Sequence, residues 1–119
     1  MRNDRENKIV DLTIQFALDI IDYCGILEEK KKFVISRQLL KSGTSIGANV
    51  SEAQNGESIH DFVHKMKIAA KEADETKYWI VLCEKSPGLP FNPARKEQLQ
   101  SIIYILSRII STSKLKSNT

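Results

Sequence analysis

The sequence predicts an all-α protein, an antiparallel up-down-up-down four-helix bundle that forms a single domain over residues 1–119. Two observations predict this fold. Apolar residues recur three and four positions apart along most of the chain, which is the spacing of one helix face. Turn-forming residues interrupt that spacing at only three places, which are Gly25, Asn55-Gly56 and the stretch from Pro87 to Pro90. Connections this short make successive helices antiparallel neighbours.

The punctuation places the helices at about residues 4–24, 28–54, 58–85 and 93–114. The first helix has one apolar stripe that suits the core, formed by Ile9, Leu12, Phe16, Ile20 and Tyr23. A second apolar stripe runs beside it and contains Val10, Ile14, Ala17 and Ile21. This excess leaves a narrow polar sector, which consists of Asp11, Gln15, Asp19 and Asp22.

The second helix contains Gly43 and Gly47, and each glycine costs about 1 kcal/mol relative to alanine in a helix. Close approach of another helix across a groove floored by Gly43, Gly47 and Ala48 would offset that cost. Small or polar residues also recur at helical spacing beside the apolar stripe, namely Gln38, Ser42, Ser45, Asn49 and Glu52. We expect this polar seam to hydrogen-bond to the third helix, where Glu72, Glu75, Lys71 and Tyr78 offer partners, and to specify helix register.

The third and fourth helices have recognisable starts. Ser58 with Asp61 is typical of a capping box, and Asn92 before Pro93 is typical of an N-cap followed by proline at the first helical position. The expected core face of the third helix is Ile59, Phe62, Val63, Met66, Ala69, Ala70, Ala73, Ile80 and Val81. That of the fourth is Leu99, Ile102, Ile103, Leu106, Ile109 and Ile110.

Apolar residues remain on the other sides of two helices, and they predict self-association. On the third helix they lie opposite the core face and include the single tryptophan. A row of apolar residues on a helix surface is more typical of an interface than of a solvated face. The candidate oligomer interface is Trp79, Leu82, Ile68, Val10, Ile14 and Ile21.

The net charge is only +3, but residues 30–50 contain five basic residues and no acid. An acidic partner such as RNA or DNA is one interpretation, and a solvated helix face is the other. Arg37 and Lys41, one turn apart, are the first candidates for phosphate contacts, followed by Lys30, Lys31 and Lys67.

No group of residues predicts catalysis, a cofactor or a metal. His60 and His64 are one helical turn apart as in zinc-binding helices, but the chain has no other histidine to complete a site. Cys24 and Cys83 are expected to be reduced core thiols. A charged start and the absence of a long apolar run predict a cytoplasmic protein without membrane contact.

The second and third helices resemble the four-helix-bundle proteins encoded in intervening sequences of bacterial 23S ribosomal RNA genes. The resemblance covers residues 37–84 and rests on the stretch from Ser42 to Ala53, on Glu57-Ser58, Asp61-Phe62 and His64-Lys65, and on Ala69 through Trp79. It implies a homopentameric ring, similar to the accessory variability proteins of diversity-generating retroelements, which bind nucleic acid and a reverse transcriptase. The family has no established biochemical activity, so the resemblance assigns no binding residue.

Together these observations predict a non-enzymatic oligomer that binds RNA or DNA through a basic surface and delivers it to a second protein. The alternative is a protein-protein interaction module without nucleic-acid binding. A hydrolase or nuclease that uses acids of the polar seam ranks third.

Overall fold

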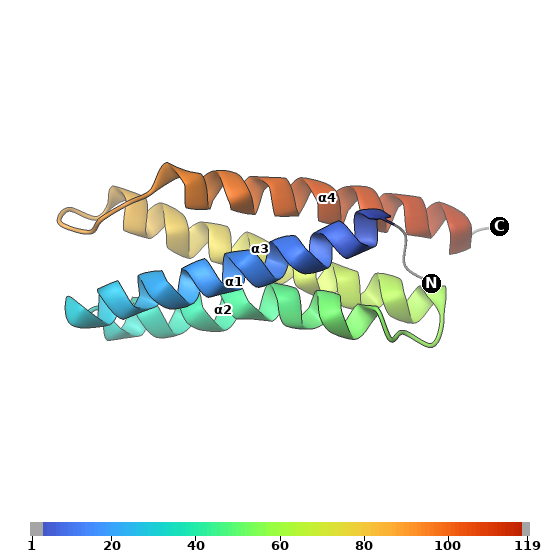
Figure 1. Ribbon diagram of the computed structural model, residues 1–119, viewed down its shortest axis with the longest axis horizontal. Helices are drawn as coiled ribbons and strands as arrows, with labels where there is room; N and C mark the ends of the chain where they lie inside the picture. The colour runs from blue at the N-terminus through green and yellow to red at the C-terminus, as the bar shows by residue number, and fades with distance from the viewer. Residues whose placement is uncertain (1–3, 118–119) are drawn as a thin grey trace.

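The computed structural model describes residues 4–117 of the chain, with side chains for residues 8–116. The described chain forms four helices, α1 (Asp4–Glu29), α2 (Phe33–Ala53), α3 (Ile59–Lys85) and α4 (Pro93–Ser117). They lie side by side and alternate in direction along a rod of 52 × 20 × 19 Å (Figure 1). Each helix packs against two others, α2 between α1 and α3, and α4 between α3 and α1. The predicted all-α four-helix architecture is confirmed.

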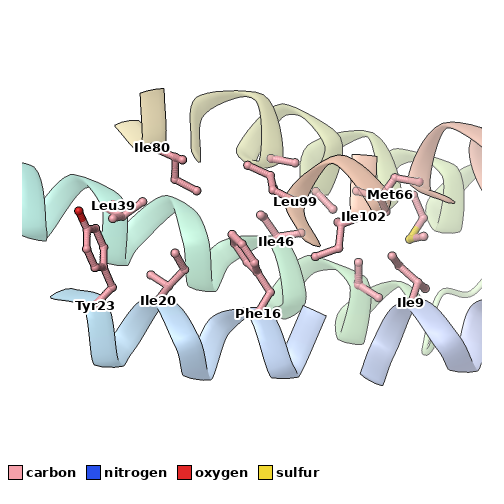
Figure 2. Close-up of a cluster of buried hydrophobic side chains, with 14 of the residues drawn as sticks. Ile9, Phe16, Ile20, Tyr23, Leu39, Ile46, Met66, Ile80, Leu99 and Ile102 are labelled. Carbon is pink, nitrogen blue, oxygen red and sulfur yellow. The ribbon is translucent and has the colours of Figure 1, made fainter. Parts of the chain in front are cut away.

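A continuous apolar core runs along the axis of the bundle (Figure 2). Phe16, Ile20 and Leu39 are among its fully buried members, and α4 contributes Leu99 and Ile102. Most of the predicted core stripes are buried or packed against this cluster. Ile59 is an exception, because it is the first residue of α3 at the end of the bundle and is 42% exposed.

The expected break at Gly25 is wrong, because α1 continues through it to Glu29 and α2 begins at Phe33 instead of residue 28. Leu27 is fully buried, so the core stripe extends beyond the glycine. The helix ends in a Schellman motif in which Lys32 N donates to Leu27 O at 2.8 Å and Lys31 N donates to Glu28 O at 2.9 Å. Lys31 occupies the left-handed position, with φ 63°, that glycine usually fills.

Both predicted helix starts are confirmed. Ser58 Oγ accepts from Asp61 N at 3.0 Å, while the Asp61 carboxylate accepts from Glu57 N at 3.2 Å. Asn92 Oδ1 accepts from Ala94 N at 3.0 Å at the start of α4. Ser58 and Asn92 thus satisfy amide groups that a helix N-terminus leaves without an intrahelical partner, and Asp61 binds the amide that precedes the cap.

Two polar contacts fasten the end of α1 to its neighbours. Cys24 Sγ donates to Ser36 O at 3.4 Å, and Ser36 Oγ donates back to Cys24 O at 3.2 Å. Tyr23 OH donates to Pro90 O at 2.9 Å, so the segment between α3 and α4 is held against α1. Cys24 and Cys83 are free and buried, as predicted, and burial raises the pKa of both thiols.

Arg95 is a buried charge that pattern reasoning missed. Its guanidinium lies 4.2 Å from the ring centroid of Tyr23, and its Nε donates to Asp19 Oδ2 at 2.7 Å. Asp19 therefore belongs to an interhelical ion pair, although its position predicts a solvated sector. Burial, followed by the nearby Cys83, raises the pKa of Tyr23 and keeps its hydroxyl protonated for the bond to Pro90.

Candidate assembly and nucleic-acid surfaces

An apolar strip on α1 remains exposed in the bundle. Ile14, Leu18 and Ile21 are 47%, 52% and 48% exposed, and Val10 is half-buried beside them. Helical spacing puts Val10, Ile14 and Ile21 toward the side of α1 that adjoins α2, whereas Leu18 faces outward and lines a groove on each side of α1. The strip agrees with the second stripe expected from the sequence, and it adds Leu18, which sequence reasoning did not select.

A shallow groove separates this strip from α2. It has a volume of about 230 Å³ and is lined by Thr13, Ile14, Ala17, Leu18, Thr44, Gly47, Ala48 and Ser51. The α2 side consists of small residues, so the groove floor is low and can admit a side chain from another molecule. Leu40, 36% exposed, continues the apolar surface on α2.

The glycines of α2 allow the close approach of α1 that the sequence predicts. A Cβ atom added to Gly43 would lie 3.0 Å from Ile20 Cγ2, and one added to Gly47 would lie 3.2 Å from Thr13 Cβ. Both distances are shorter than ordinary van der Waals contact. Ala48 is exposed and lines the open groove, so it does not face α1 directly as Gly43 and Gly47 do.

The apolar residues of α3 lie on a different face from the α1 strip. Ile68, Trp79 and Leu82 are half-buried, not exposed opposite the core as the sequence predicts. Trp79 packs against the core cluster, and its Nε1 donates to Glu75 Oε2 at 3.2 Å. Ile68 and Trp79 share the flank of α3 that adjoins α2, because helical spacing aligns them with that side. The candidate interface thus divides into two surfaces with α2 between them.

The polar seam of α2 adjoins α3 and connects to it at two points. The Ser42 and Thr76 hydroxyls hydrogen-bond at 2.9 Å in the core, and Glu52 Oε1 lies 3.9 Å from Lys65 Nζ at the surface. These partners differ from Glu72, Glu75, Lys71 and Tyr78, which the sequence suggests. Thr76 and Lys65 lie on the side of α3 that adjoins α2, whereas Lys71, Glu75 and Tyr78 are exposed on its outer side.

The remaining seam residues bond within α2 or lie at its edge. Asn49 Nδ2 donates to Ser45 O at 2.9 Å, and Ser45 Oγ donates to Lys41 O at 2.6 Å. Gln38 and Asn49 are half-buried. The seam therefore contains one buried interhelical hydrogen bond, flanked by local ones.

The basic candidates occupy two separate places. Arg37 and Lys41 are exposed one turn apart on α2, and Lys30 and Lys31 lie in the turn that precedes this helix. Lys67 lies on α3, close in sequence to Lys65, whose contact with Glu52 marks the opposite end of α2. The 15 residues from Arg37 to Glu52 span about 22 Å along a helix, so the structure does not bring Lys67 to the other four candidates.

Lys67 belongs to a second basic cluster. The neighbouring ammonium group of Lys114 on α4 is the main cause that lowers the pKa of Lys67, and Lys71 makes the smallest contribution. Lys114 also lines a groove of about 420 Å³ between α3 and α4, together with Ala70, Asp74, Ile103, Ser107, Ile110 and Ser111. The sequence could not pair Lys67 with Lys114, because they are 47 residues apart and only the packing of α3 on α4 joins them.

The described part of the chain contains no group of three or more His, Cys, Asp or Glu side chains placed to hold a metal ion. None of its helices is long and apolar enough to cross a membrane. His60 and His64 are both exposed on α3.

Comparison with known proteins shows the family of this bundle. Residues 5–112 match the family described as 23S rRNA-intervening sequence protein. The chain belongs to this family. A solved structure with a similar fold is that of a protein of unknown function from the S23 ribosomal protein family of Bacteroides thetaiotaomicron, with 37% sequence identity and a TM-score of 0.84. The match covers 90% of this chain and 98% of that protein. No curated protein matches the chain.

Membership extends the resemblance well beyond residues 37–84, because the match includes most of α1 and α4. The S23 family relative shares the four-helix fold, and its function is unknown.

Proposed function

We propose that this member of the 23S rRNA-intervening sequence protein family is a non-enzymatic homo-oligomeric scaffold, pentameric as its resemblance implies, that binds RNA or DNA. The observation that carries the proposal is the exposed strip of Ile14, Leu18 and Ile21 above a groove of small residues. Burying such a strip against a second copy removes apolar surface from water, which stabilises the assembly by about 25 cal/mol per Å² of apolar surface buried. A second protein is the further expected partner.

A ring requires two different surfaces on each subunit, because neighbours in it meet head to tail. The α1 strip and the flank of α3 with Ile68 and Trp79 are separated by α2, which supports this arrangement. Leu82 lies nearer the outer face of α3 by helical spacing.

Nucleic-acid binding is supported by the exposure of Arg37, Lys41, Lys30 and Lys31 around one end of α2. A monomer with net charge +3 has few phosphate contacts to offer. An oligomer repeats each cation, so several weak contacts act on one strand or duplex at the same time.

Replacing Leu18 with Glu tests assembly. The variant places a charge in the middle of the apolar strip, so we expect light scattering at micromolar concentration to give a smaller mass than the wild-type oligomer. Tyr104→Glu is a matched control, because Tyr104 is 63% exposed on α4, away from both surfaces. A monomer mass for the wild-type protein would contradict the proposal.

The double variant Arg37→Gln and Lys41→Gln tests nucleic-acid binding. We expect its affinity for unrelated duplexes to fall to a similar extent. The plot of log affinity against log salt should flatten by about 2 for each subunit that contacts the duplex, because each subunit loses two phosphate contacts. The oligomer should remain intact. An unchanged salt slope would exclude this face of α2 as the phosphate-binding surface. If the wild-type protein binds no nucleic acid at low salt, the alternative function as a protein-protein interaction module remains, which the groove between α1 and α2 also suits.

A further inference from the structure

We infer that the outer face of α3 binds single-stranded nucleic acid, with a base stacked on Tyr78 and phosphates held by the lysines on either side. The inference rests on the proposed nucleic-acid binding and assigns its substrate class and a second contact surface. It is carried by a row of exposed cations interrupted by one exposed aromatic ring.

The row follows from helical spacing. Lys71, Tyr78 and Lys85 are seven residues apart, so they project from the same side of α3 at intervals of about 10 Å. All three are exposed, and Tyr78 is 57% exposed. Lys67 lies one turn before Lys71, and Lys114 of α4 stands beside it. A strand laid along this face would meet cations on both sides of the ring.

Neighbouring contacts hold the Tyr78 ring in place. It packs edge-on against Trp79, with ring centroids 5.2 Å apart and an interplanar angle of 72°. Trp79 is in turn fixed by the core and by its bond to Glu75. A supported ring presents its face to a base without the entropy cost of ordering a mobile side chain. Stacking on such a ring is sequence-tolerant, because every base has a π face.

Two of the acids near this row, Glu75 and Glu84, have contacts of their own. Glu75 accepts from Trp79 Nε1, and Glu84 Oε1 lies 3.0 Å from Lys96 Nζ of α4. Asp74 lines the groove between α3 and α4 with Lys114. By helical spacing Asp74 and Glu75 lie to either side of the line from Lys71 to Lys85, so they flank the path of a strand instead of blocking it.

A duplex cannot use the aromatic part of this face, because its bases are already stacked on each other. A convex helix with one exposed ring and no motif that reads a groove therefore favours unpaired bases, whereas its lysines attract phosphates of either form. RNA and DNA single strands share the chemistry that this face recognises.

The test uses the full chain with fluorescein-labelled 15-nucleotide strands of oligo(dT) and oligo(U), and with a 15-base-pair duplex, in 50 mM KCl. We expect Tyr78→Ala to weaken binding of the single strands about tenfold by fluorescence anisotropy, and to leave the duplex affinity within a factor of two. Tyr78→Phe keeps the ring and should bind like the wild type. Tyr104→Ala, an equally exposed tyrosine on α4, is the matched control and should change neither affinity.

The single tryptophan provides a second readout. Because Trp79 contacts Tyr78, we expect binding of a strand to quench its fluorescence, and we expect the quenching to be lost in Tyr78→Ala. Lys67→Gln with Lys71→Gln should weaken both single strands and duplex. If oligo(dT) and oligo(U), which differ in the sugar and in the C5 methyl group of the base, differ in affinity, the inference stands for the tighter one.

The outcomes separate this inference from the proposed function. Tyr78→Ala and Tyr104→Ala variants with equal single-strand affinity would overturn stacking on α3, whereas salt-dependent duplex binding through Arg37 and Lys41 would still support the proposed function. Absence of all binding at 50 mM KCl would overturn both.

Discussion

Whether a helical glycine can be replaced depends on what its missing Cβ would meet. Gly25 and Gly43 provide the contrast within one bundle. Nothing lies within 4 Å of a Cβ at Gly25, whereas one at Gly43 would lie 3.0 Å from Ile20 Cγ2. The first glycine is therefore replaceable, and the second lets α1 and α2 approach each other.

We expect Gly25→Ala to raise the free energy of unfolding by about 0.5–1 kcal/mol, because alanine favours the helix and has less freedom in the unfolded chain. Gly43→Ala should lower it by about 1–3 kcal/mol, because the added methyl group displaces Ile20 from a packed core. Urea unfolding of the two variants measures both values. Equal shifts of the two urea midpoints would contradict this prediction, because they would mean that α1 moves away from position 43 at little cost in stability.

Lys31 holds the left-handed conformation that ends α1, at φ 63°. A side chain in this conformation costs roughly 1 kcal/mol relative to glycine. We expect Lys31→Gly to raise the free energy of unfolding by about that amount, with Lys30→Gly as a control that gains nothing. The same variant loses a candidate phosphate contact, so stability and nucleic-acid affinity should move in opposite directions.

At the scale of elements, the features predicted correctly from the sequence depend on residues close to one another in the chain. Caps at Ser58 and Asn92 lie beside the amides they bind, and the core stripes repeat within a single helix. The end of α1 could not be predicted, because Gly25 has the composition of a helix end while Lys31, which performs that role, does not.

The sequence identified many residues of the candidate surfaces, but it did not show on which face of the bundle each of them lies. The sequence selects Ile14, Ile21, Arg37 and Lys41, and the structure exposes all four. It could not show that Trp79 lies on a different face from Ile14, since that depends on which flank of α3 adjoins α2. Likewise the pairing of Arg95 with Asp19 depends on the packing of α4 on α1.

The contact between α1, α2 and the end of α3 predicts a pH dependence of stability. Burial raises the pKa of Cys24 and Cys83 in the folded protein, so the folded state keeps these protons more tightly than the unfolded one. The two protonated thiols contribute fully to the free energy of unfolding below the unfolded-state pKa of about 8.5, and this contribution is lost as the pH rises above that value.

We therefore expect urea midpoints of the wild type to fall between about pH 8 and 9.5, before most lysines titrate. A Cys24→Ala, Cys83→Ala variant should be less stable at pH 7 and should lose less stability over the same interval. Parallel curves for the two proteins would contradict this assignment. Tyr23 has its pKa raised by burial too, and it should add a further loss above about pH 10.

At the scale of the whole molecule, α2 is the central element. It packs on α1 through its glycines and on α3 through Ser42 and Thr76, and it separates the two apolar surfaces. The outer faces of α2 and α3 carry the basic residues considered above. The pair of α2 and α3 thus combines interhelical packing with exposed basic residues.

The arrangement of the helices also has a consequence for the order in which the chain folds. Three of the four interhelical contacts join neighbours in sequence, whereas the α1–α4 contact joins the two ends of the chain and is the least extensive of them. Closing the longest loop costs the most entropy and gains the least contact. We expect the hairpins of α1 to α3 to form first and α4 to dock last, so that Ile46→Val slows refolding while Ile102→Val mainly accelerates unfolding in stopped-flow measurements.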